Sequence, residues 1–412
     1  MTRTAEVVVV GAGIIGASIA FQLARHGVGN VIALDKGRGP SEGSTGASSS
    51  IVRCRYTHPE VVRLAYHGQE SYGNWLEFTG LAETRSGLQR IGVLWMMGAP
   101  AGKVKADAAK LVFEGVEARA IGPDQVTDLF PALSSCAAPY DLDDEGDHVC
   151  VPGDAFLFEP GGGYADPVGA NQDLIEAAGD RGVAVEFNSR VTAVLRDQGR
   201  VTGVRVADGS EISAGLVINA AGPWCNQLNR MAQVHLRWTL TPTRIQTVYR
   251  TWPPDLGPLP VAADSSTGIY FRPQSGGQQV LIGSVLAEDE KEIVEDPDEF
   301  KRVPDAEFSE MKLAAFQHRV PALAARGQVS GVAGLYTINR EDVHPVVGPS
   351  GVDGFWVANG FSGHGFKLAP AVGSMVAQAF TGRSTEFDTD VPMSFFGVDR
   401  EPIDLAVKHV LA

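Results

Sequence analysis

Four consecutive valines open the pattern of apolar positions along this chain. Residues 7–10 are all β-branched, which is typical of a strand buried on both faces of a parallel sheet. A glycine-containing turn follows, and a second apolar run at 31–34 predicts another strand. Between them, apolar residues recur at helical spacing up to Gly27: Ala17, Ile19, Ala20, Leu23 and Ala24. The order strand, turn, helix, strand indicates a parallel sheet with a crossover helix.

Later segments add strands to this picture. Residues 190–206 predict a β-hairpin that turns at 199–200, and 215–219 predict a buried strand that runs into a glycine turn. Residues 354–367 predict a strand and a glycine-rich turn, and the helix that follows is expected over 368–380.

The middle of the chain has a different pattern. Residues 89–96 are strand-like, and 117–129 are helix-like before a proline. Alternating apolar and polar residues at 244–249, 268–271 and 279–285 predict three strands of a sheet with one face more polar than the other. These segments indicate a second sheet, built differently from the first.

The turn after the first strand has the spacing of a dinucleotide-binding motif. Gly11 permits the tight turn, Gly13 permits close approach of a pyrophosphate, and Gly16 permits the helix to pack on the strand. Asp35 ends the second predicted strand, 19 residues after Gly16, where an acidic side chain accepts hydrogen bonds from a ribose. NAD and FAD both use this motif, so it leaves the choice between them open.

Composition and charge limit the possible partners. A chain of 412 residues exceeds the usual size of a single core, so two domains are expected. The net charge of −15 leaves no basic stripe to neutralise phosphates, which argues against nucleic acid as a partner. Residues 288–299 are strongly acidic and are expected to form a solvated surface loop.

The cysteines and the apolar runs also carry expectations. Cys54, Cys136, Cys150 and Cys225 include no CxxC pair, so neither a metal site nor a redox pair is predicted. The first apolar run is too short for a signal peptide, and no 18 consecutive residues are apolar, so we expect no membrane partner. A cytoplasmic location fits these features.

Two segments outside the motif favour a flavin over a nicotinamide. Residues 43–50 carry small hydroxyl side chains that let the backbone wrap a diphosphate and a ribityl chain, although a flexible surface loop has the same composition. The turn at 360–367 leads into a helix, whose N-terminus carries unpaired N–H groups and a partial positive charge. Such an N-terminus suits the electron-rich pyrimidine edge of a flavin.

On these residues the chain resembles the D-amino-acid-oxidase superfamily of flavoproteins, in the branch of sarcosine oxidase, glycine oxidase and dimethylglycine dehydrogenase. The matching segments run from residue 11 to residue 373, nearly the whole chain, and the last is the most specific: GAGIIGASIAFQLARHG with ALDKG, GSTGASSSIVR, GGGYADP, VINAAGPW, GIYFRP and VANGFSGHGFKLAPAVG. The resemblance implies an α/β fold, with a Rossmann-like FAD-binding domain and a second α+β substrate domain on a mixed or antiparallel sheet. The expected FAD-binding domain is discontinuous, over 1–85, 155–225 and 330–412, and the substrate domain covers 86–154 and 226–329.

The resemblance implies FAD as the cofactor, held without a covalent bond. Gly334 stands where sarcosine oxidase has its flavin-linking cysteine. The residues expected to bind FAD are Gly11, Gly13, Ile14, Ile15, Gly16, Asp35, Lys36, Ser44, Thr45, Ala47, Ser48, Ser49, Val191, Ala221, Gly222, Trp224, Gly360, Gly363, His364, Gly365 and Lys367.

In this family a hydride equivalent passes from the carbon beside an amine to the flavin, so the protein supplies orientation and charge. By resemblance, Arg53 and Lys367 bind the substrate carboxylate, and a planar guanidinium suits bidentate pairing. Tyr270 is the expected active-site tyrosine over the flavin, with Tyr56 as a weaker candidate, and core packing is the alternative for both. His364 is expected near the flavin ring.

The chain departs from its relatives at three positions. Leu281 stands where sarcosine oxidase has its oxygen-activating lysine, and Val285 where it has an active-site histidine, which predicts a more apolar pocket suited to an alkyl chain on nitrogen. Tyr336 stands where glycine oxidase has an arginine.

The expected reaction is oxidation of an N-substituted glycine or a similar amino acid, with oxygen or another electron acceptor as the second substrate. The missing lysine keeps open a dehydrogenase that passes electrons to a protein or a quinone. A non-catalytic FAD-binding subunit of a larger complex is the third alternative.

Overall fold

The computed structural model describes residues 3–139, 148–324 and 327–405 of the 412-residue chain. Four short ranges lie outside the described residues: 1–2, 140–147, 325–326 and 406–412. They fall within the domain ranges expected from the sequence. Among the described residues, helices that are both long enough and apolar enough to cross a bilayer are absent.

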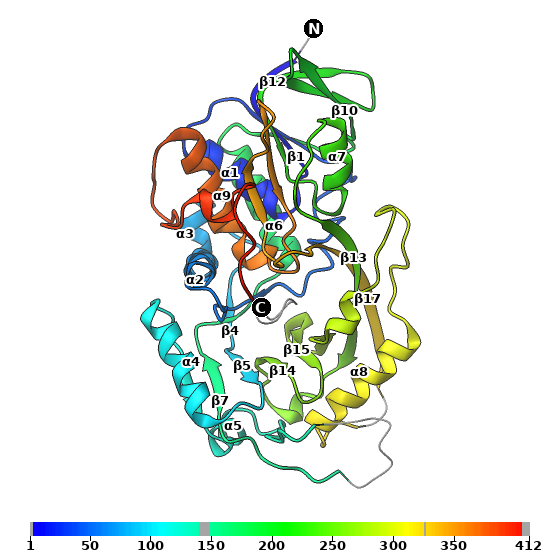
Figure 1. Cartoon of the computed structure of the whole chain (residues 1–412). Helices are drawn as coiled ribbons and strands as arrows, with labels where there is room; N and C mark the ends of the chain where they lie inside the picture. Colours follow the sequence, from blue (N-terminus) through cyan, green and yellow to red (C-terminus); the bar gives the residue numbers. More distant parts are fainter. Residues whose placement is uncertain (1–2, 140–147, 325–326, 406–412) are drawn as a thin grey trace.

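The upper half of the molecule in Figure 1 is built on an eight-stranded sheet with a parallel centre. Its main path runs β10-β11-β12-β1-β2-β9, and β19 and β18 continue from β12. The strands β9, β2, β1, β12 and β19 pair in parallel, as the valine run predicted. Their bounds are β1 Arg3–Val10, β2 Val31–Leu34, β9 Ala184–Glu186, β10 Val191–Asp197, β11 Arg200–Val206, β12 Glu211–Asn219, β18 Val346–Pro349 and β19 Phe355–Asn359.

The α-helices of this half, among the described residues, are α1 Ile14–Arg25, α2 Pro59–Gly73, α3 Trp75–Thr79, α6 Pro167–Gly179, α7 Cys225–Met231 and α9 Gly365–Thr381. The helices α1 and α9 approach closely because Gly373 has no side chain to hold them apart from Ser18, whose hydroxyl donates to the carbonyl of Ala369 at 2.7 Å. The packing of α9 on α1 brings the C-terminal glycine-rich turn to the N-terminal motif.

The lower half is built on a second eight-stranded sheet, in the order β17-β13-β16-β15-β14-β5-β7-β6. All its pairs are antiparallel except β14 with β5, so the sheet is mixed, as expected for the second domain. Its strands are β5 Val93–Met96, β6 Arg119–Ile121, β7 Phe156–Glu159, β13 Leu240–Thr251, β14 Val261–Asp264, β15 Ile269–Gln274, β16 Gln279–Ser284 and β17 Val329–Asn339. The helices of this half are α4 Ala101–Phe113, α5 Pro123–Leu129 and α8 Ala306–Arg319.

A small third sheet connects segments that the sequence places far apart. It consists of β3 Ile51–Val52, β4 Gln89–Arg90 and β8 Gly163–Tyr164, with β8 paired to both neighbours. Gly163 lies very close to Gln89: a Cβ added at Gly163 would be 1.9 Å from the carbonyl oxygen of Gln89. This sheet fixes the chain immediately before Arg53.

The two large sheets suggest where the chain divides. The strands β7 and β17 lie in the second sheet, although the sequence assigned their residues to the FAD-binding ranges 155–225 and 330–412. We therefore propose that the substrate domain extends to Glu159 and Asn339 at these two boundaries. The long strands β13 and β17 pair with each other over eleven residue pairs and join the halves (Figure 1).

Two local predictions were wrong. The helix expected over 117–129 occupies only its second half, because Pro123 begins α5 while 119–121 pair with β7 as a strand. The single strand expected over 89–96 is split at Gly92, whose φ of +80° interrupts it between β4 and β5.

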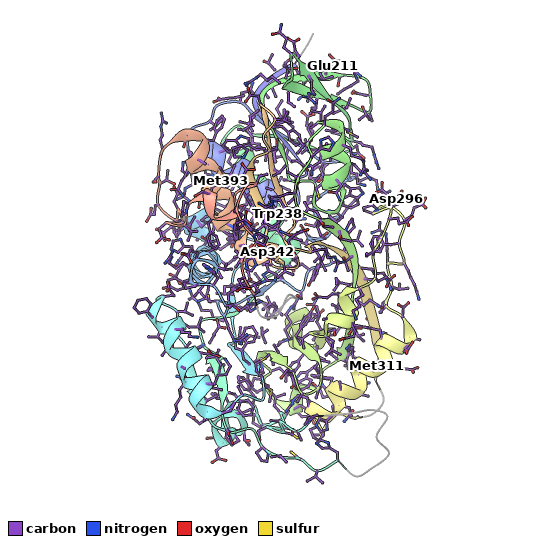
Figure 2. All side chains as sticks on the ribbon, viewed as in Figure 1. Glu211, Trp238, Asp296, Met311, Asp342 and Met393 are labelled. Carbon is purple, nitrogen blue, oxygen red and sulfur yellow. The ribbon has the colours of Figure 1, made fainter. Side chains whose placement is uncertain are left out.

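The chain after α9 is held by a buried carboxylate, Asp342, which Figure 2 labels near the middle of the molecule. Asp342 pairs with Arg400 and accepts a hydrogen bond from the amide of Ile403 at 2.8 Å. A buried ion pair of this kind fixes the segment that leads to residue 405.

Candidate active site

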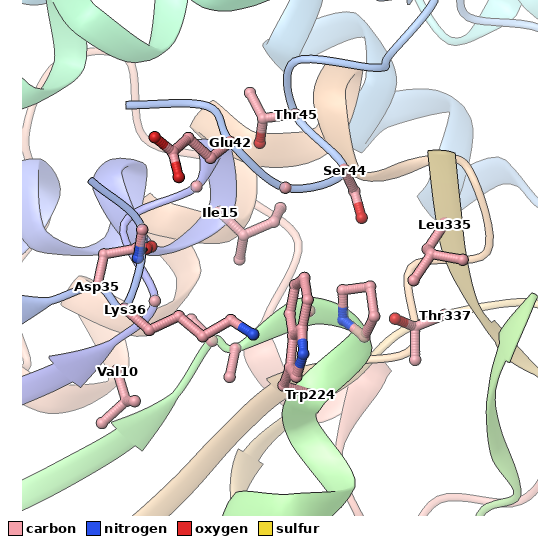
Figure 3. A pocket seen from close by; sticks show the side chains of 18 of the residues that line it. Val10, Ile15, Asp35, Lys36, Glu42, Ser44, Thr45, Trp224, Leu335 and Thr337 are labelled. Carbon is pink, nitrogen blue, oxygen red and sulfur yellow. Dashed lines mark hydrogen bonds between the residues drawn. The ribbon is translucent and has the colours of Figure 1, made fainter. Parts of the chain in front are cut away.

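A cavity of about 570 Å³ lies at the carboxyl ends of β1 and β2, where open α/β sheets bind their ligands. Figure 3 shows its walls: Ile15 from the start of α1, Asp35 and Lys36 after β2, Ser44 and Thr45 opposite them, and Trp224 from the segment after β12. The turn before α9 and residues 335–337 of β17 complete the lining. The volume falls in the range of small-molecule and cofactor sites.

The glycine motif has the close contacts that its spacing predicts. Gly11 has φ +103°, and an added Cβ would lie 2.4 Å from the carbonyl oxygen of Ala220. At Gly16, an added Cβ would lie 1.8 Å from the carbonyl oxygen of Gly11. The amide of Ile14 donates to the hydroxyl of Thr45 at 3.0 Å, which joins the hydroxyl-rich segment to the start of α1.

Asp35 is fixed by two backbone amides. One carboxylate oxygen accepts from the amide of Ala12 at 2.8 Å and the other from the amide of Gly37 at 2.7 Å. The carboxylate therefore stands at the tip of β2 on the cavity wall, where the ribose of a dinucleotide lies in this fold.

Lys36 crosses the cavity mouth toward Trp224 (Figure 3), with its ammonium 3.7 Å from the ring centroid. The same ammonium pairs with Asp298, which also accepts from the indole N–H of Trp224 at 3.1 Å. Asp298 belongs to the acidic segment 288–299, which was expected to be only a solvated loop. At Asp298 this segment is part of the cavity wall.

Most residues expected to bind FAD line this cavity: Gly11, Gly13, Ile14, Ile15, Asp35, Lys36, Ser44, Thr45, Ser48, Val191, Ala221, Gly222, Trp224, Gly360, Gly363 and Gly365. Ala47 lies behind the wall, against Gly334, in a neighbouring cavity. Gly16, Ser49, His364 and Lys367 are not among the lining residues.

A second, smaller cavity of about 50 Å³ adjoins the first. Ser48, Tyr336, Gly363 and Phe366 line both. The small cavity brings together three residues that the sequence assigned to the substrate site, Arg53, Tyr270 and Lys367, with residues assigned to the cofactor, among them Ser49. Residues from three distant parts of the chain thus meet at one junction.

Arg53 is buried and held between aromatic rings. Its guanidinium carbon lies 4.3 Å from the ring centroid of Tyr56 and 5.1 Å from that of Trp95, and one N–H donates to the carbonyl of Arg55. Cation–π contacts with two rings restrict the direction of the guanidinium. Tyr56 does not line the small cavity and packs against the guanidinium of Arg53 instead.

Lys367 faces the same cavity from the first turn of α9. Burial and, next, the nearby Arg53 hold the pKa of its ammonium well below the usual lysine value. An anion bound between these two cations relieves their repulsion and favours the protonated lysine. The pair therefore suits a carboxylate.

Glu159 was missed by the sequence analysis, because its importance depends on burial rather than on a motif. Its carboxylate accepts from the amide of Cys54 at 2.7 Å and from the indole N–H of Trp95 at 2.6 Å. Burial raises its pKa, although these hydrogen bonds and the charge of Arg53 oppose the shift. Glu159 thus fixes both the backbone beside Arg53 and a ring of the cavity wall.

Tyr336 was also missed as a site residue. It lines both cavities, and its ring lies so close to Gly363 that an added Cβ there would be 2.5 Å away. The sequence marked this position only as a departure from glycine oxidase.

Tyr270 has a hydrogen bond with Ser49, and burial raises its pKa.

Three residues expected at the pocket line neither cavity. His364 is fully buried and packs against the rings of Tyr56 and His344, and it lines neither cavity, so it supports the turn from behind. Leu281 and Val285 are buried in the core and do not line the small cavity. These two positions therefore do not support an enlarged small cavity.

Comparisons with known proteins agree with this geometry. The chain is 26% identical over 402 residues to dimethylglycine dehydrogenase, mitochondrial, of Rattus norvegicus, covering 93% of this chain but only 44% of that protein. It is 28% identical over 391 residues to glycine oxidase of Pseudomonas aeruginosa, covering 93% and 96% of the two chains. The crystal structure of L-proline dehydrogenase from P. horikoshii superposes with a TM-score of 0.78 at 25% identity, covering 96% and 97%.

The glycine turn, the acidic tip of β2 and the adjoining cavity all have the form that a flavin dinucleotide requires. Residues 6–379 match the family described as FAD dependent oxidoreductase, which is most of the chain. The protein therefore belongs to this family of FAD-dependent oxidoreductases and uses FAD as its cofactor.

Proposed function

We propose that this protein oxidises the C–N bond of a small amino acid, with an N-substituted glycine as the preferred class of substrate. The observation that carries the proposal is the convergence of Arg53 and Lys367 on the small cavity beside the dinucleotide cavity. Two buried cations that line one confined cavity favour a carboxylate as the ligand.

Each residue of the small cavity has a defined part in this proposal. Arg53 pairs with the substrate carboxylate through its planar fork, and Lys367 supplies a second positive charge. The carbon next to the carboxylate then lies at the junction of the two cavities, with Tyr270 and Trp95 as walls. Bound FAD supplies the two-electron acceptor chemistry at this junction.

The size of the cavity supports a small substituent on nitrogen. About 50 Å³ leaves little space beyond a short amino acid. The names of two relatives are consistent with this class, since dimethylglycine is an N-substituted glycine and proline is a secondary amine with a carboxylate. Because Leu281 and Val285 do not line this cavity, they give no support for a longer alkyl chain on the substrate nitrogen.

Loss of a hydride, which is two electrons and one proton, from the glycine carbon leaves an iminium, and loss of the N–H proton of a secondary amine then gives the imine. Water hydrolyses the imine to glyoxylate and an amine, and oxygen accepts the electrons as hydrogen peroxide. A dehydrogenase that passes electrons to a protein or quinone is the alternative, because the resemblance puts Leu281 where sarcosine oxidase has its oxygen-activating lysine.

An anaerobic screen of amines tests this function. We expect sarcosine or dimethylglycine to bleach the flavin absorbance faster than glycine, and glyoxylate to accumulate on turnover. If the colour returns with hydrogen peroxide when air is admitted, the enzyme is an oxidase; if bleaching persists in air, it is a dehydrogenase. If no amino acid bleaches the flavin, the proposal is wrong and a non-catalytic FAD-binding subunit takes its place.

We also expect the FAD to be held without a covalent bond. Gly334 lies against Ala47 and offers no nucleophile, and none of the four cysteines, all of them described, lines the large cavity. Acid precipitation of the yellow protein should release the flavin into the supernatant, measured by its absorbance. Flavin that stays with the pellet after washing contradicts this expectation.

A further inference from the structure

Three side chains with metal-binding atoms meet at the lower end of the second domain, away from both cavities. One ligand atom from each of Cys136, His148 and His318 lies within 4.8 Å of the other two. The sulfur of Cys136 is 3.3 Å from Nε2 of His148, and the two imidazole rings lie 4.3 Å apart, nearly perpendicular. None of the three lines the dinucleotide cavity or the small cavity.

A fourth donor adjoins this group. Cys150 lies two residues before Pro152, which forms a backbone bridge with Cys136, and its side chain is exposed. With Cys150, the set has two sulfur and two imidazole donors, a combination typical of structural zinc sites.

The distances suit a tetrahedral ion. Zinc binds sulfur at ~2.3 Å and imidazole nitrogen at ~2.0 Å, so a sulfur and a nitrogen ligand of one zinc ion lie about 3.5 Å apart. The separation of 3.3 Å between Cys136 and His148 is close to this value.

The backbone already joins the two cysteine segments. Cys136 and Pro152 form an antiparallel bridge, flanked by the hydrogen bonds of Ala137 N to Val151 O at 2.8 Å and Gly153 N to Ser135 O at 3.0 Å. The pairing holds the residues next to Cys150 beside Cys136 without any metal.

The histidine from α8 is fixed by its neighbour. Arg319 is fully buried, pairs with Asp264 at 2.6 Å, and donates to the carbonyl of Cys136 at 2.7 Å. Arg319 thus ties the cysteine backbone to the end of α8, where His318 projects toward the sulfur. Figure 1 shows α8 along the lower edge, in the part of the molecule farthest from the N-terminal strand.

We propose that Cys136, His148, Cys150 and His318 bind a structural Zn²⁺ ion that holds the backbone around Cys136 and residues 148–150 against the end of α8. Zinc is the expected metal because thiolate and imidazole donors favour it over Mg²⁺ or Ca²⁺, which require oxygen ligands. The sequence predicted no metal site because it lacks a CxxC pair. His318 enters from a position 168 residues beyond Cys150, which no local spacing reveals.

The test measures metal in the FAD-loaded enzyme. Protein from zinc-supplemented cells should retain about one zinc ion per chain after gel filtration, as one four-ligand site requires. Cys136→Ser and His318→Gln should each reduce the zinc content at least tenfold, whereas His235→Gln, at an exposed histidine elsewhere, should not. The flavin content of each variant reports whether it has folded.

A second measurement needs no variant. Replacement of zinc by cobalt in the wild-type enzyme should give the intense absorption of a thiolate–cobalt bond. Alkylation of the denatured, unreduced protein should label all four cysteines. A wild-type enzyme without zinc or cobalt binding, zinc retained in both ligand variants, or only two labelled cysteines, which indicates a Cys136–Cys150 disulfide, would each overturn the proposal.

Discussion

Replacing Arg53 with alanine is expected to lower kcat/KM by roughly 30-fold to several thousand-fold while FAD stays bound. The loss of one partner of a buried charge pair costs on the order of 2–5 kcal/mol, which corresponds to that range in rate. Lys367→Met should fall in the same range, because its ammonium faces the same cavity. Steady-state kinetics with the best amine from the screen, together with the flavin absorbance, measure both effects.

Matched controls distinguish a lost contact from a general loss of charge. Arg38→Ala and Lys110→Met remove cations whose side chains are 88% and 80% exposed, and we expect unchanged kinetics in both. Arg53→Lys keeps the positive charge but loses the planar guanidinium that can pair with both carboxylate oxygens. The activity of this variant should therefore lie between those of the wild type and the alanine variant. Normal kcat/KM in both Arg53→Ala and Lys367→Met would refute the carboxylate assignment.

The lowered pKa of Lys367 gives this pair a pH signature. The deprotonated lysine loses its attraction for an anion, so acetate, a carboxylate without an amine, should bind more weakly as the pH rises through the lowered pKa. Perturbation of the flavin spectrum reports this binding. Lys367→Met should remove this pH dependence.

Replacing Gly16 with alanine is expected to weaken FAD binding by roughly 5- to 150-fold, from a cost of ~1–3 kcal/mol for overpacking. The added Cβ would lie 1.8 Å from the carbonyl oxygen of Gly11, and neither atom belongs to a flexible side chain. The turn must open to relieve the clash, and FAD binding must close it again. Titration of the apoprotein with FAD, followed by flavin fluorescence, gives the dissociation constant.

Gly29→Ala is the matched control for this substitution. No heavy atom lies within 4 Å of an added Cβ at Gly29, and the residue lies outside the cavity. We expect its dissociation constant for FAD to equal that of the wild type. Equal constants for Gly16→Ala and the wild type would mean that α1 shifts to accommodate the methyl group.

The sequence predicted the parts of the fold that depend on neighbours in the chain. The valine run, the glycine turn and Asp35 follow one another within 35 residues, so local pattern alone specified β1, α1 and β2. The hairpin of β10 and β11 was predicted in the same way, from its turn at Gly199. The helix expected over 117–129 failed because pairing with β7, a contact with residues 156–158, prevailed over helical spacing.

The site residues that the sequence missed are those brought in by distant segments. Asp298 reaches Lys36 and Trp224 from an acidic segment that resembles any surface loop. Tyr336 enters the cavities only because β17 pairs with β13. Nothing next to these residues in the chain distinguishes them.

The dinucleotide cavity has a consequence for how the protein folds. The residues that line this cavity run from Val10 to Phe366 along the chain. The last of them, in the turn before α9 and in its first residues, are synthesised long after the glycine motif has left the ribosome. The FAD site is therefore complete only when most of the chain has been synthesised. Until then, the N-terminal βαβ unit has no cofactor bound at its glycine turn. Contacts of such wide separation slow folding, so cofactor supply and chaperone protection during this interval should govern how much active enzyme a cell obtains.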